Sequence, residues 1–210
     1  MLASFVLEVY AEAYEAKSPV VGFAETSTPL VAEPRQPVAA RAGTVERFDD
    51  DYARRGVRHV FMLCEPTPGW RHIAVTEQRT RPACARPMQW RVDEAFPEAA
   101  RVRVVLETLN TPRAAALYET FVPAEARRLL RKLAFHSTPK HGSWLKIGEI
   151  ALSVLGRQCL DRRIGDAETL KRAIKKLEEE RHAACAKIAW RFTTGDARRK
   201  LHRLYPSTSD

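Results

Sequence analysis

The chain has 210 residues, of which 45% are hydrophobic and 29% are charged, which fits one globular domain and leaves too little chain for two. No run of 18 or more apolar residues occurs, and the start carries acids instead of the basic segment of a secretory signal. We therefore expect a cytoplasmic protein that does not contact a membrane. The four cysteines are scattered without a CxxC pair, which argues against a zinc knuckle and a disulfide framework.

The net charge of +9 is distributed unevenly along the chain. Residues 1–120 carry 15 Lys and Arg against 16 Asp and Glu, whereas residues 121–210 carry 20 against 10. The positive excess of the second part suits a phosphate backbone, because neutralised phosphates release their condensed counterions. The alternative is a set of solvated helical faces.

The first half of the chain predicts a helix followed by strands. The apolar pattern predicts an amphipathic helix over residues 2–16 and a buried strand over residues 20–24. Residues 26–43 contain three prolines and no helical period, so we expect a loop or an irregular hairpin. Two further strands, over residues 59–64 and 72–76, are joined by a turn rich in Pro and Gly.

The second half alternates helices and strands. A charged helix from about residue 167 to 184 begins after Asp166, which is a suitable N-cap. This order predicts a mixed α/β fold in which an antiparallel beginning is extended by a crossover strand. The other expected elements are a helix over 88–96, a strand over 102–106, helices over 112–121 and 124–133, and a strand over 134–136.

The segment Thr138–Leu155 places a single carboxylate, Glu149, inside an apolar helical run. The apolar residues of this run are so dense that we expect the helix to be largely covered and Glu149 to be buried. A buried carboxylate needs a partner. A metal ion, an arginine and backbone groups are the candidates.

Five stretches of sequence occur in a distinctive order over nearly the whole chain. They are Phe61–Pro66 with Gly69–His72, Leu109–Thr111 with Leu117–Glu119, Thr138–Glu149, Arg157–Ile164, and Trp190–Thr194. Together they resemble the catalytic domain of bacterial insertion-sequence transposases of the mariner-related DDE superfamily. The resemblance implies a ribonuclease H-like fold with a mixed five-stranded sheet flanked by helices. It also implies that residues 1–165 form the catalytic domain and residues 166–210 a basic helical extension of it.

In that family three carboxylates hold two divalent cations, Mg²⁺ or Mn²⁺, which activate a water or a DNA 3′-hydroxyl for attack on a phosphodiester. The resemblance places the second and third carboxylates at Glu107 and Glu149, our predicted catalytic and metal-binding residues. The first maps to Ala24, which cannot bind a metal. Because strand residues alternate between faces, we expect the neighbouring Glu25 to point away and not to replace it. We expect Glu107 and Glu149 to converge beside a gap left by Ala24.

The resemblance thus implies a truncated and degenerate domain that is related to DNA transposition and is catalytically inactive. Lys140 and His141, before the Glu149 helix, are predicted to contact DNA phosphates, and an exposed loop without a ligand is the alternative. Family members usually carry helix-turn-helix domains before the catalytic one, so specific recognition of transposon ends is expected to be missing.

Two alternatives to this function stay open at the level of the sequence. The first is an active, divergent metal-dependent nuclease in which another acid replaces the lost ligand. The second is a non-enzymatic interaction protein, for example an inhibitor of an intact transposase. Besides DNA, the predicted partners are therefore a second copy of this chain or an intact transposase.

Overall fold

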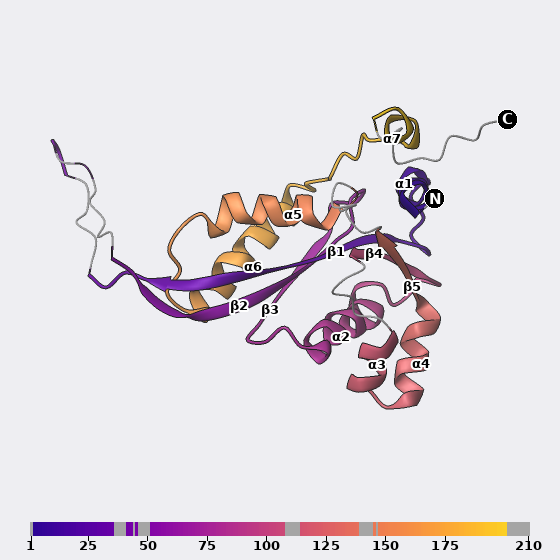
Figure 1. Cartoon of the computed structure of the whole chain (residues 1–210), viewed down its shortest axis with the longest axis horizontal. Helices are drawn as coiled ribbons and strands as arrows, with labels where there is room; N and C mark the ends of the chain where they lie inside the picture. The colour runs from indigo at the N-terminus through magenta and orange to yellow at the C-terminus, as the bar shows by residue number, and fades with distance from the viewer. Residues whose placement is uncertain are drawn as a thin grey trace.

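A central sheet with helices on both faces forms the core of the computed structural model (Figure 1), which describes residues 2–35, 41–43, 45, 51–107, 114–138, 145 and 147–200. Within these residues the strands are β1 (Val20–Ala32), β2 (Ala53–Cys64), β3 (Arg71–Thr76), β4 (Val102–Glu107) and β5 (Leu133–Thr138). The helices are α1 (Leu2–Ala11), α2 (Arg81–Trp90), α3 (Ala114–Thr120), α4 (Pro123–Lys132), α5 (Ile147–Leu155), α6 (Ala167–Ala183) and α7 (Thr194–Lys200). Single π-helical turns, η1 (Arg91–Ala95) and η3 (Gly156–Leu160), follow α2 and α5.

The strand order is β3-β2-β1-β4-β5. Strand β2 runs antiparallel to both β1 and β3, whereas β4 is parallel to β1 and to β5. The antiparallel beginning is therefore extended by parallel strands that follow helical crossovers, as the element order predicts. Because β1 and β4 are parallel and adjacent, their carboxyl ends lie at the same end of the sheet.

Strand β1 is longer than predicted. It continues to Ala32 through a register shift between Pro29 and Val31, and it pairs with β2 back to Ala53 (Figure 1). The expectation of a loop from residue 26 is therefore wrong for this part of the chain. Among the described residues β4 pairs with β1 only as far as Gly22, and further along this edge no described strand follows, although the Val31 N–H donates to the Ile164 carbonyl at 2.8 Å. A proline, which cannot donate a hydrogen bond, is tolerated at such an edge.

The two faces of the sheet carry separate apolar clusters. Phe23, Phe61 and Leu106 belong to a cluster that includes residues of α2, α3 and α4. Met62 and Cys64 belong to a second cluster with residues of α5 and α6. Phe61 and Met62, which are adjacent in the sequence, face opposite sides of the sheet because successive side chains of a strand alternate between its faces. The sheet is thus the middle layer of three.

Helix boundaries follow local capping. Helix α2 begins earlier than predicted because the Thr80 hydroxyl accepts a hydrogen bond from the Ala83 N–H at 3.3 Å. Helix α6 begins after Asp166, as predicted, with the Asp166 carboxylate accepting from the Thr169 N–H at 2.8 Å. Helix α7 was not predicted. Among the described residues no helix is both long and apolar enough to cross a bilayer.

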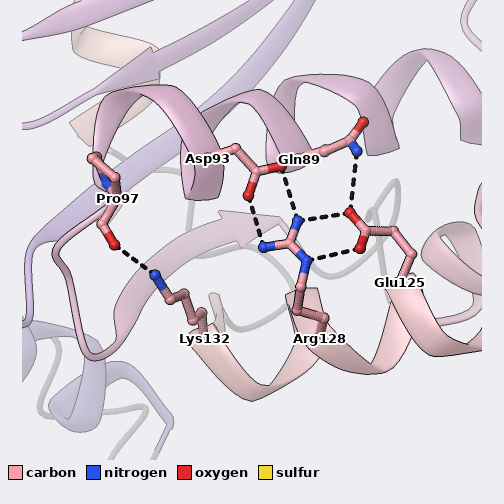
Figure 2. A network of polar contacts seen from close by, with 6 residues as sticks. All are labelled: Gln89, Asp93, Pro97, Glu125, Arg128 and Lys132. Carbon is pink, nitrogen blue, oxygen red and sulfur yellow. Dashed lines mark hydrogen bonds and ion pairs between the residues drawn. The ribbon is translucent and has the colours of Figure 1, made fainter.

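A polar network ties α4 to the α2–η1 unit (Figure 2). The Arg128 guanidinium pairs with Asp93 of η1 at 2.8 Å and with Glu125 of its own helix at 2.6 Å. Glu125 also accepts from the Gln89 side chain at 3.2 Å. Lys132 donates to the carbonyl of Pro97 at 2.7 Å, so two cations of the basic α4 helix are engaged within the protein.

Candidate functional site

Two of the three positions predicted to carry the metal-binding carboxylates lie on one face of the sheet, and the third lies on α5, which packs against that face. Gly22 of β1 is level with Val105 of β4, and the same register places Ala24 level with Glu107, the last residue of β4. Residues two apart on a strand share a face. Val105 packs in a cluster with Leu145, just before α5, so Glu107 faces the α5 side of the sheet as well.

Helix α5 approaches β1 closely at Gly22 and Ala24. A Cβ placed on Gly148 would lie 2.8 Å from the Cβ of Ala24 and 3.0 Å from its backbone nitrogen. A Cβ placed on Gly22 would lie 2.8 Å from the nitrogen of Gly148. The glycines allow helix and strand backbones to touch, and Ala24 is only 6% exposed. The expected gap beside Ala24 is therefore wrong, because the α5 backbone fills it.

Glu149 is exposed, so the prediction that it is buried is also wrong. Helix α5 turns Ile147, Gly148, Ala151 and Leu155 toward the sheet. Glu149 therefore falls on the outer side, together with Ile150, which is 42% exposed. The density of apolar residues predicted a largely covered helix. In the structure only one stripe of α5, which includes the small residues Gly148 and Ala151, contacts the sheet, and the opposite side is exposed. An exposed carboxylate can meet a ligand that arrives from solvent.

Glu107 is half-buried at the carboxyl end of β4, opposite Thr138 in the β4–β5 register. Thr138 is fully buried, and its hydroxyl donates to the Leu106 carbonyl at 3.4 Å. This pairing fixes the backbone of both strand ends. The structure thus places Glu107 and Glu149 on the same side of the sheet, and their role as metal ligands stays a prediction.

Glu25 points to the opposite face, as the strand alternation predicts. Its carboxylate pairs with Arg79, just before α2, and the Glu25 side chain is only 14% exposed. The same carboxylate lies near Cys84 of α2, where burial, and after it the charge of Glu25, raises the pKa of the thiol to about 11. Glu25 is therefore held beneath α2, away from Ala24 and α5.

The donor set present does not fit a pair of divalent cations. Such a centre needs several carboxylate oxygens, and position 24 supplies a methyl group. In the part of the chain that the structure describes, no group of three or more His, Cys, Asp or Glu side chains is arranged to hold a metal ion. The three-carboxylate arrangement implied by the resemblance is thus incomplete.

Some basic side chains are paired within the protein, and others are not paired within the described residues. Lys140 and His141, the predicted DNA contacts, lie outside the described residues. On α6 the lysines pair with acids of the same helix, as Lys171 does with Glu168 at 2.8 Å. Arg157 of η3 and the nearby Arg162 are exposed and have no hydrogen bond or ion pair within the described residues. Both arginines belong to the matching stretch Arg157–Ile164. The sequence does not predict that they lack partners, because only the fold shows which cations are paired.

Arg157 and Arg162 line one surface pocket between η3 and α6. The pocket also contains Lys176 and two acids, Asp161 and Glu180. Its cations therefore outnumber its anions by one. The exposed Arg127 and Arg131 of α4 also have no hydrogen bond or ion pair within the described residues, so this pocket is one of the places where unpaired guanidinium groups from one short segment lie together.

Comparison with known proteins gives one family and one fold. The family profile described as "DDE superfamily endonuclease" matches residues 20–171. A solved Mos1 mariner paired-end complex with Mn is similar at a TM-score of 0.52 and 12% identity, over 88% of this chain and 56% of that chain. A Mos1 transposase paired-end complex with the left transposon end has a TM-score of 0.38 and 14% identity, over 89% of this chain and 61% of that chain. No curated protein sequence matches.

The likeness to the Mos1 complex with Mn confirms the predicted fold. The mixed five-stranded sheet flanked by helices corresponds to the ribonuclease H-like fold of the Mos1 structure. The chain spans little more than half the length of that protein.

Proposed function

The chain belongs to the DDE superfamily endonucleases, and we propose that within this family it is a transposase-type domain that does not cleave DNA. The observation that carries the proposal is Ala24 in the first half of β1, level with Glu107 when the Gly22–Val105 register is extended, and packed against Gly148. Catalytic groups must sit within about half an ångström of a productive geometry. Two carboxylates, one of them a Glu in place of the family's Asp, do not provide that geometry for two cations.

The structure also argues against rescue by Glu25. An acid that replaced the lost ligand would have to reach the α5 face, and Glu25 is paired with Arg79 on the α2 face. We therefore favour an inactive domain over an active divergent nuclease.

A nicking assay on supercoiled plasmid tests this proposal. With Mg²⁺ or Mn²⁺ present, we expect no turnover above that of the Glu149→Ala variant. Metal-dependent turnover that Glu149→Ala abolishes would contradict it. The double variant Ala24→Asp, Glu107→Asp restores an acid at all three positions, but Gly148 packs against Ala24, so we expect it to nick DNA only if α5 moves away from β1. Glu168→Gln, an exposed change on α6, is the matched control in that background.

We further propose that the domain retains non-specific binding to DNA through phosphate contacts. The excess of cations in residues 121–210 and the unpaired Arg157 and Arg162 support this, with Lys140 and His141 as further proposed contacts. Fluorescence anisotropy with a short duplex should give a log affinity that falls linearly with log salt. Arg157→Ala with Arg162→Ala should reduce that slope by roughly two, whereas Lys171→Ala should change it less. Absence of binding at low salt would refute the proposal.

The proposed domain includes the helix after residue 165. Leu170 and Ile174 of α6 are buried in the same cluster as Met62 of β2 and Ile147 of α5. We propose on this ground that α6 folds together with the sheet as an extension of one domain.

A further inference from the structure

Two of the matching stretches, the β2–β3 turn and the segment that begins at Trp190, take no part in the proposed site. The turn holds the chain that follows α6. The Ile188 N–H donates to the Pro66 carbonyl at 3.0 Å, and the buried Arg71 guanidinium donates to the Ala186 carbonyl. Gly69 has a φ of +79°, and a Cβ there would lie 2.9 Å from the carbonyl carbon of Ala186. The turn is therefore shaped for this close contact.

The next contacts lead from this segment to the start of α5. The Trp190 ring packs against the Tyr10 ring of α1, with centroids 5.0 Å apart, and the Trp190 indole N–H donates to the Phe192 carbonyl at 2.7 Å. The Tyr10 hydroxyl donates to the Leu145 carbonyl at 3.0 Å. Leu145 itself is fully buried. The side chains clustered with it are Val6, Leu7, Val9, Val105 and Ala197.

Helix α1 and the last described helix, α7, therefore meet around Leu145, as their positions near each other in Figure 1 also show. Leu145 lies two residues before the first residue of α5 and four before Glu149. Burial raises the pKa of Tyr10, so the phenol stays protonated and remains a donor at neutral pH. A buried carbonyl that loses its donor is costly, so this one bond restrains the chain as it enters α5.

We propose that α1 and residues 186–200 form a brace that sets where α5 begins, with Tyr10 and Trp190 as its positioning residues. The brace rests on the proposed function only in the role given to Glu149, whose direction follows from the start of α5. The restraint on the start of α5 depends only on the contacts described above. In this brace the β2–β3 turn and the Trp190 segment anchor the two ends.

Hydrogen–deuterium exchange on the full chain tests the brace. Tyr10→Phe keeps the ring and removes the hydroxyl, so amides of α5 should exchange roughly two- to tenfold faster while those of β4 do not change. Trp190→Ala should have a larger effect in the same place, and Trp190→Phe should recover most of the protection because it keeps a ring against Tyr10. Tyr118→Phe, on the exposed face of α3, is the matched control and should change nothing in α5.

Two results would overturn the brace. One is unchanged exchange in α5 for Tyr10→Phe, and the other is equal acceleration in α5 and β4, which would indicate general loosening. If Trp190→Ala does not fold, Tyr10→Phe still decides the question. Exchange needs no metal and no DNA, so metal-dependent nicking by the unaltered chain that Glu149→Ala abolishes would count against the proposed function and leave the brace standing.

Discussion

The contact between α5 and β1 predicts an unusual response to a glycine-to-alanine change. Alanine is normally favoured over glycine in a helix by about 1 kcal/mol. At Gly148, however, the new methyl group would lie 2.8 Å from the Ala24 Cβ and 3.0 Å from backbone atoms of Phe23 and Ala24. Backbone atoms of a central strand cannot move aside, so overpacking should cost about 2–3 kcal/mol. Gly148→Ala should therefore destabilise the protein by a net value of about 1–2 kcal/mol.

The measurement is urea and thermal unfolding of Gly148→Ala beside Gly156→Ala. For a chain of this length the net loss corresponds to a fall in Tm of about 2–8 °C. Gly156 lies in η3 without a positive φ, and a Cβ there would meet no atom within 4 Å. Gly156→Ala should instead stabilise by about 0.5–1 kcal/mol. If both variants gain stability equally, the close approach of α5 to β1, and with it the account of position 24, is wrong.

Three further predictions concern charges. Arg91 is fully buried, its three side-chain nitrogens have no hydrogen-bond partner among the described residues, and its guanidinium lies 5.2 Å from the Phe96 ring centroid. Arg91→Met should leave the free energy of unfolding unchanged or raise it by up to about 3 kcal/mol, measured in urea, and a large loss would contradict this. Burial raises the pKa of Glu65 from 4.5 to about 7. The folded state thus favours the protonated acid, so stability should fall as pH rises from about 4.5 through 7, by roughly 2 kcal/mol at most, and Glu65→Gln should flatten that slope in pH-dependent urea titrations. An identical slope in the variant would exclude Glu65 as the source. Arg128, 45% exposed at the centre of the network in Figure 2, should contribute less than about 1 kcal/mol, and the loss measured for Arg128→Ala should shrink in high salt. A loss that does not depend on salt would mean that packing, not charge, dominates.

The sequence predicted most of what depends on neighbours along the chain. The opposite directions of Ala24 and Glu25 follow from the two-residue period of a strand, and the start of α6 follows from the cap at Asp166. The burial of Glu149 was mispredicted, because the number of apolar residues in a helix does not tell which stripe meets the sheet. Here that stripe includes Gly148, whose lack of a side chain gave no hydrophobic signal.

The amino-acid sequence by itself determined the order of elements, the family resemblance and the loss of the first carboxylate, since an alanine has no metal-binding group in any fold. Only the tertiary structure decided that the space beside Ala24 is filled by the α5 backbone, that Arg157 and Arg162 have no partner among the described residues, and that Tyr10 reaches Leu145. These contacts join segments that are far apart in the chain. Their distances depend on how whole elements pack, which no local pattern of residues records.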